Sequence, residues 1–196
     1  MNHVRYESIE IELPRPGVRI PDCFISQAKS FLNCVLERID QKFLKNGGRT
    51  YLERASILQL PAILYVADGD LCGKKILDLA AGACPSNVLE PHGGIPDPKY
   101  EPWLCRLLFY MDVDVIGLDI GNLRDEPFKS YSGIDLSEKD SPAMIPDNFI
   151  DIAHLSTLLS GHYVIKGSNG ISTHPTMENQ LERIVKPKGT YLWCSN

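Results

Sequence analysis

The sequence lacks any long apolar run. None of its hydrophobic stretches reaches the length of about 18 residues that a membrane-spanning helix needs. The N-terminal residues 1–17 also have neither the charged start nor the apolar centre of a secretory signal. We therefore expect a cytoplasmic protein with no membrane partner.

Positive charge is scarce as well. The chain has 20 lysines and arginines against 25 aspartates and glutamates, and its net charge at pH 7 is -5. A protein held on nucleic acid by phosphate neutralisation needs a basic surface, so nucleic acid is not favoured as a partner. Lys42, Lys45, Arg49 and Arg54 are grouped, but we expect them to form a solvated helix face.

Cysteine motifs are also absent. The six cysteines include no C-x-x-C pair, and no histidine lies at zinc-finger spacing from them. We expect no metal site, and we expect reduced thiols that pack as small hydrophobic groups. The 196 residues are 43% hydrophobic, which is enough to bury one sizeable core.

The N-terminal part of the chain, residues 1–72, has a strand pattern followed by helical patterns. Apolar and polar residues alternate over Tyr6–Leu13, which predicts a half-buried strand. An apolar stripe at helical spacing over residues 24–39 predicts one helix, and a second stripe over residues 50–66 predicts another. Pro61 lies inside the second stripe, so we expect this helix to kink or to end early there.

The second part, residues 73–196, alternates short apolar runs with helical stretches. The predicted strands are KKILDLA, VDVIGLDI, YSGIDL, NFIDIAHL and GTYLWCS. Helical patterns at 101–111 and 176–185 can cover both faces of the sheet that these strands form. The pattern predicts a doubly wound, mostly parallel α/β sheet, packed with the N-terminal part in one domain.

Small residues follow the first of these strands. Residues 76–84 read ILDLAAGAC, in which an acid, Asp78, precedes small residues at the alternating positions Ala80, Gly82 and Cys84. Small side chains let the chain turn sharply and let a ligand approach the backbone. The stretch resembles the first motif of the class I S-adenosylmethionine-dependent methyltransferases, which usually has glycine at these three positions. The resemblance implies that these residues bind the methionine and ribose parts of the cofactor S-adenosylmethionine.

Acidic residues end the next two predicted strands as well. Asp119 and Ile120 end the second strand, and Asp135 and Leu136 end the third. The resemblance implies that the Asp119 carboxylate accepts hydrogen bonds from both ribose hydroxyls. It also implies that Asp135 and Leu136 bind the adenine ring. The order of the strands and helices over residues 73–196 is more specific to this family than any single motif. This order implies a Rossmann-like methyltransferase fold.

The methyl acceptor is the part of the site that the sequence describes least. His154 lies at the end of the fourth predicted strand, where the family often has acceptor-side residues, and it is our candidate catalytic base. A lone histidine can equally be a structural hydrogen-bonding group. The stretch 154–157 reads HLST and lacks the family's signature for amino-group methylation, which disfavours a nucleobase acceptor. We expect a small-molecule or protein acceptor, bound between the loops 85–100 and 154–163.

Three functions fit these residues. The first is a methyltransferase. The second is an inactive methyltransferase-like binding or scaffold protein, which the residues Ala80 and Cys84 in place of glycines favour. The third is a nicotinamide-dependent oxidoreductase, which is disfavoured because G-x-G-x-x-G is missing and Asp119 lies far from the first strand.

The edge of the predicted sheet needs a partner. In the order third, second, first, fourth, fifth, the fifth strand at 189–195 lies at an edge, and the chain ends at Asn196, where the family continues with two more strands. Apolar edges promote aggregation. We expect the N-terminal segment or a second chain in a homodimer to cover this edge. We also expect Tyr51 or Arg54 to lie near the acceptor pocket.

Overall fold

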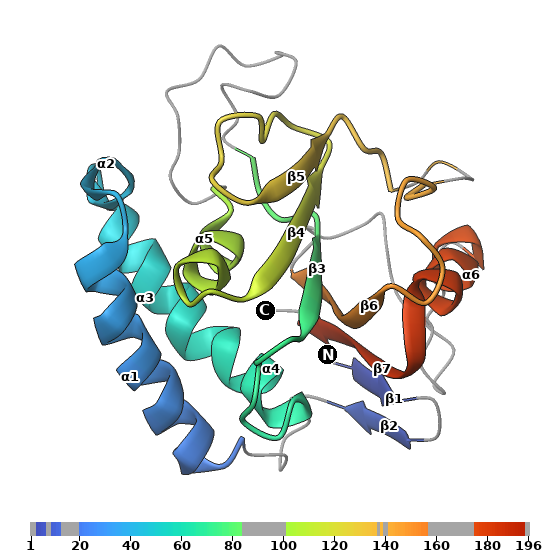
Figure 1. The fold of residues 1–196 in the computed structure, drawn as a ribbon, viewed down its shortest axis with the longest axis horizontal. Coiled ribbons are helices and arrows are strands. Elements are labelled where there is room, and N and C mark those ends of the chain that lie inside the picture. The colour runs from blue at the N-terminus through green and yellow to red at the C-terminus, as the bar shows by residue number, and fades with distance from the viewer. Residues whose placement is uncertain are drawn as a thin grey trace.

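The computed structural model of the chain has one sheet with helices on both faces (Figure 1). It describes residues 3–6, 9–12, 20–83, 101–136, 138, 141–156 and 175–194. Among these residues, no helix is both long and apolar enough to cross a membrane.

The N-terminal part contains four helices within residues 20–83. They are α1 (Asp22–Arg38), α2 (Gln41–Leu44), α3 (Gly48–Leu58) and α4 (Leu60–Val66). The predicted second helix is therefore two helices that meet at Gln59, and Pro61 lies in the first turn of α4. A proline is tolerated there because the first-turn amides of a helix have no partner within it. The expected early break at Pro61 is confirmed.

Within the described part of the chain, the sheet has seven strands in the order β2-β1-β7-β6-β3-β4-β5. They are β1 (His3–Tyr6), β2 (Ile9–Glu12), β3 (Lys75–Leu79), β4 (Asp114–Asp119), β5 (Lys129–Ser132), β6 (Ile150–Ser156) and β7 (Val185–Cys194). The strands from β3 to β7 pair in parallel, in the predicted order third, second, first, fourth, fifth. This is a Rossmann-like α/β fold.

Side chains alternate between two hydrophobic layers. Ile76 of β3 packs on one face, in the layer that includes α1, α3, α4 and α5 (Trp103–Tyr110). Leu77 and Leu79 point to the other face, in the layer that includes α6 (Pro175–Ile184). Leu77 is fully buried, and burying a leucine side chain contributes about 1.5–3 kcal/mol. Figure 1 shows α6 across the sheet from the other helices.

The structure corrects the predicted position at which the third strand ends. We predicted a strand that ends at Asp135 and Leu136, whereas β5 is Lys129–Ser132. Gly133 has a φ of +72°, a left-handed conformation that ends the strand and is accessible to glycine at little cost. Asp135 and Leu136 therefore lie beyond the sheet, on the segment that follows this turn.

The N-terminal segment covers the outer edge of β7. β1 pairs antiparallel with β7, in a register that places His3 opposite Trp193, and β2 pairs with β1 (Figure 1). The expected pairing of this segment is confirmed, but the single strand predicted over Tyr6–Leu13 is wrong. Apolar residues fall at even positions up to Tyr6 and at odd positions from Ile9 onward, so the alternation changes phase where one strand gives way to the next.

Candidate functional site

The site lies where the parallel strands end. The chain adds strands in one direction from β3 to β5 and then returns to place β6 on the other side of β3. In doubly wound sheets, ligands bind in the crevice beyond the carboxyl ends of the strands at such a reversal. The backbone after β3, at residues 80–83, and the loop after β4, at residues 120–128, border this position.

The chain turns sharply after β3. Ala80 has a φ of +55° and Gly82 a φ of +99°, so both have the left-handed backbone that favours glycine. The amide of Ala81 donates to the carbonyl of Leu118 on β4 at 2.8 Å and ties the turn to the neighbouring strand. The structure thus has the sharp turn after β3 that the small residues predicted. Cys84, the third position of the motif, lies outside the described residues.

Asp119 connects this turn to the end of β4. Its Oδ2 accepts a hydrogen bond from the Gly82 amide at 2.9 Å, and its Oδ1 accepts one from the Gly121 amide at 2.7 Å. Asp119 is 9% exposed, and burial raises the pKa of its carboxyl although the bonds from Gly121 and Gly82 oppose the shift. A carboxylate oxygen can accept more than one hydrogen bond, so the group retains acceptor capacity for a ligand.

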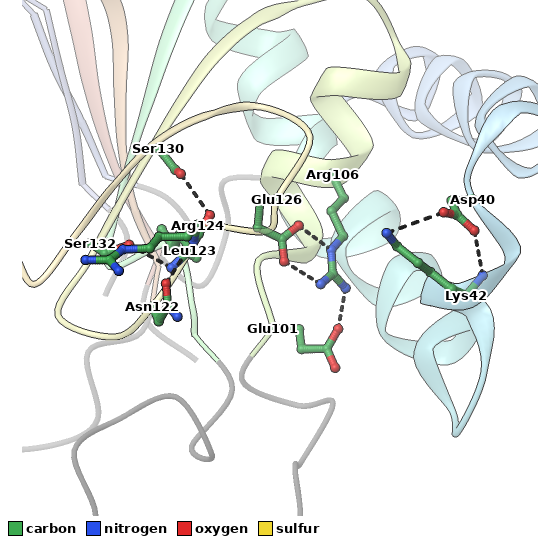
Figure 2. Close-up of polar contacts among 10 residues, drawn as sticks. All are labelled: Asp40, Lys42, Glu101, Arg106, Asn122, Leu123, Arg124, Glu126, Ser130 and Ser132. Atoms are coloured by element: carbon green, nitrogen blue, oxygen red, sulfur yellow. Dashed lines mark hydrogen bonds and ion pairs between the residues drawn. The ribbon is translucent and has the colours of Figure 1, made fainter.

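The loop after Asp119 presents an apolar side chain and is attached to β5. Ile120 is 60% exposed, the highest value among the large hydrophobic side chains of the described residues. Leu123 in the same loop bonds two hydroxyls of β5: its carbonyl accepts from Ser130 Oγ at 2.9 Å, and its amide donates to Ser132 Oγ at 2.8 Å (Figure 2). The loop is therefore fixed to the strand next to β4.

Asp135 and Leu136 lie close to Asp119 in the fold. The amide of Ile134 donates to the backbone carbonyl of Asp119 at 3.0 Å, which brings the segment after β5 to the end of β4. Asp135 is half-buried, and Leu136 is buried in the layer that contains α6. The predicted contact of these two residues with adenine stays a prediction.

Asp78 and His154 form a pair inside the sheet. They are opposite each other on β3 and β6, and His154 Nδ1 lies 2.7 Å from Asp78 Oδ1. Cys105 of α5 donates from its Sγ to Asp78 Oδ2 at 3.4 Å. His154 is fully buried and Asp78 is 2% exposed. The side chains of the predicted cofactor residue and the predicted base thus contact each other below the surface, and both predicted roles remain untested.

Gly117 makes room for Phe128 and for the Cys105 thiol that bonds Asp78. It is the residue of β4 opposite Asp78, and a Cβ there would lie 2.8 Å from Phe128 Cε2 and 3.3 Å from Cys105 Sγ. Burial raises the pKa of the Cys105 thiol well above its ordinary value. Our expectation of packed thiols holds for Cys105 but is wrong for Cys23, Cys34 and Cys72, which are exposed on the surface.

One group of charged residues at this end of the sheet was not predicted from the sequence. Arg106 of α5 makes ion pairs with Glu101 and Glu126 and is 4% exposed (Figure 2). Its partners lie 5 and 20 positions away, and one sequence offers no signal that pairs them. Among the described residues, no group of histidine, cysteine, aspartate or glutamate is arranged to hold a metal ion.

The two residues expected near the acceptor lie on α3. The ring of Tyr51 stacks on Trp103 at 6.4 Å between centroids, and the Arg54 guanidinium lies 5.8 Å from the Tyr51 ring. The basic residues of α2 and α3 are exposed, as expected for a solvated helix face. A role for Tyr51 or Arg54 at an acceptor pocket stays a prediction.

The fold and the arrangement of Asp119, Gly82 and Ile120 define a Rossmann-like domain with a candidate ligand site at the carboxyl edge of its sheet. No protein-family profile and no curated protein matches the chain. The chain is similar to a solved structure described as the trans-methyltransferase CalH in complex with SAH, at 13% identity and a TM-score of 0.44. The similarity covers 86% of this chain and 46% of that protein, so the chain spans about half of its length.

Proposed function

We propose that the protein is an S-adenosylmethionine-dependent methyltransferase that acts on a small-molecule or protein acceptor. The observation that carries the proposal is the position of Asp119. Its carboxylate lies at the end of β4, bonded to the amide of the turn after β3 and next to the exposed Ile120. An acid with spare acceptor capacity beside an apolar side chain suits the ribose and the ring of a nucleoside.

The residues present fit an adenosyl group. The left-handed turn at Ala80 and Gly82 presents backbone with little side-chain bulk, which allows close approach of a ligand. In the proposal, Asp119 binds the ribose hydroxyls, and Asp135 with Leu136 binds the adenine. S-adenosylmethionine, when bound, supplies an electrophilic methyl group on its sulfonium. The chain then needs mainly to orient the ligand and to exclude water.

His154 is the proposed general base for an acceptor that must lose a proton. The Asp78 carboxylate lies at hydrogen-bond distance from Nδ1 of its ring and so can fix the orientation of the imidazole. The full burial of His154 favours a second candidate, a methyltransferase-like binding protein without catalysis. Ligand titration followed by a turnover assay with candidate acceptors separates these two functions.

Calorimetric titration of the protein with S-adenosylmethionine and S-adenosylhomocysteine tests the proposal, with NAD as the competing ligand. Asp119→Asn keeps one acceptor oxygen and should weaken binding by about tenfold or more, since it removes charge-assisted hydrogen bonds. Asp114→Asn is the matched control, because Asp114 is an exposed acid at the opposite end of the same strand. Absence of binding at millimolar ligand, or equal losses in both variants, contradicts the proposal.

A further inference from the structure

Arg106 is a buried cation that has two acidic partners. Its Nε and Nη2 donate to the two carboxylate oxygens of Glu126 at 2.8 Å and 2.6 Å, and its Nη1 donates to Glu101 (Figure 2). Its side chain is 5% exposed, and that of Glu126 is 11% exposed. A bidentate pair of this kind fixes both the distance and the relative orientation of the two groups.

Aromatic rings enclose the same guanidinium. Its Cζ lies 4.0 Å from the centre of the Phe43 ring and 4.6 Å from that of Trp103. Phe43 belongs to α2, Trp103 begins α5, and Glu126 lies in the loop after β4, so Arg106 connects α2 with that loop. Gly48 permits this packing, because a Cβ there would lie 2.7 Å from Trp103 Cη2. Arg106 is therefore held on several sides and cannot easily move.

The electrostatics of the group keep Arg106 charged. Burial acts against its charge, but the hydrogen bonds and charges of Glu126 and then Glu101 outweigh it and raise the pKa of Arg106 above its ordinary value. Breaking such a buried pair leaves an uncompensated charge, which is strongly unfavourable. Arg106 therefore stays charged, and the buried pair is a fixed attachment between α5 and Glu126.

The attachment holds the loop that borders the candidate site. Glu126 lies near the end of the loop 120–128, the Leu123 backbone bonds β5 in its middle, and the Gly121 amide bonds Asp119 at its start. The Leu123 and Gly121 attachments are made by backbone groups to neighbouring segments. The Glu126 attachment reaches a different element, α5, and it is an ion pair.

We propose that Arg106 is a positioning residue for ligand binding: through Glu126 it fixes the loop 120–128, and with it the position of Asp119, Ile120 and Gly121 at the mouth of the site. The identity of the ligand rests on the proposed function, whereas the positioning of the loop does not. Arginine is required because lysine has a single ammonium group and cannot bond both carboxylate oxygens or stack between two rings in the same way.

A second arginine provides a matched control. Arg38 of α1 makes a bidentate pair with Asp112 at 2.7 Å and 2.8 Å, just beyond the other end of α5. This pair is exposed, with 49% of the Arg38 side chain accessible, and it does not contact the loop 120–128. The variants to compare are Glu126→Gln, Arg106→Lys and Arg38→Lys. Glu126→Gln keeps the size of the side chain and leaves Arg106 paired with Glu101. It is therefore the variant to measure if Arg106→Lys does not fold.

The first measurement needs no ligand. The Gly121 amide donates to Asp119 and the Leu123 amide donates to Ser132. The rates of hydrogen exchange at these two amides therefore report how well the loop is ordered. We expect exchange at both amides to be about tenfold faster in Glu126→Gln, because the loop opens locally, and unchanged in Arg38→Lys. Unchanged protection in Glu126→Gln and Arg106→Lys would overturn the proposal.

The second measurement is the dissociation constant of S-adenosylhomocysteine, determined alongside the urea midpoint. We expect about tenfold weaker binding in Glu126→Gln and Arg106→Lys and no change in Arg38→Lys, although all three variants lose some stability. A looser loop with unchanged affinity contradicts the positioning role. If the unmodified protein binds no S-adenosylhomocysteine, the proposed function fails, and the exchange experiment still decides whether Arg106 positions the loop.

Discussion

Replacing Ala80 with glycine should stabilise the protein, although glycine substitutions usually destabilise. Ala80 has a φ of +55°, where an L-residue with a side chain is disfavoured by about 1–2 kcal/mol. Glycine avoids this cost but gives the unfolded chain more freedom, which offsets about 0.4–1 kcal/mol of the gain. The methyl group of Ala80 is half-buried, so its loss costs a further fraction of the ~0.8 kcal/mol of a buried carbon. The expected net gain is about 0.5 kcal/mol.

Ala83→Gly is the matched control. Ala83 lies in the same turn and is 6% exposed, but its φ is not positive. Here glycine relieves no strain, so the entropic cost and the lost methyl burial together destabilise by about 1–1.5 kcal/mol. Urea unfolding of the two variants under identical conditions measures the contrast. Equal destabilisation of both would show that the turn after β3 does not need a glycine-like residue at Ala80, and the resemblance of this turn to the methyltransferase motif would lose its structural support.

Three further outcomes follow from buried and charged groups. Gly117→Ala should destabilise by about 1–3 kcal/mol because its methyl group would overlap Phe128, and Phe128→Leu should recover part of this loss in a double-mutant cycle. Burial opposes ionisation of Asp151, but the hydrogen bonds from Lys186 and from the Lys75 amide, together with the charges of Lys186 and Lys74, outweigh it and lower the pKa of the Asp151 carboxyl. The stabilisation from this carboxylate is therefore present at neutral pH and is lost as the pH falls through the folded pKa. Asp151→Asn should be less stable than the unmodified protein at pH 7 and equally stable near pH 2, as measured by the urea midpoint. Thiol-specific labelling mapped by mass spectrometry should modify Cys105 only after unfolding, since a buried thiol with a raised pKa provides no thiolate, and prompt labelling in the folded protein would contradict its burial.

The sheet was predictable from the sequence because strands buried on both faces are continuous apolar runs. The run over residues 113–118 and the runs at β3, β6 and β7 identified four strands, and right-handed connections fixed their order. β5 was placed too far along the chain because its sequence, KSYS, is polar, while the apolar residues that suggested a strand lie after Gly133. Local polarity cannot distinguish an edge strand from a loop.

The candidate site was predictable only in part. Asp119 and Gly82 follow strands, and the ends of neighbouring parallel strands meet, so their contact follows from the pattern. The pairing of Asp78 with His154 depends on the register between β3 and β6, which no local pattern encodes. The bond between Arg106 and Glu126 likewise joins a helix to a loop 20 positions away, and only the three-dimensional structure brings the two together.

The hairpin of β1 and β2 has a consequence for how the protein is made. Its two strands are neighbours in the sequence and can pair as soon as they are synthesised. The strand that they cover, β7, emerges from the ribosome after every other described strand. Joining residues 3–6 to residues 190–193 requires closing a loop of nearly the whole chain, and such distant contacts form slowly. One edge of the β1–β2 pair therefore stays unpaired until β7 has been synthesised, and we expect a ribosome-bound chain to depend on chaperones up to that point.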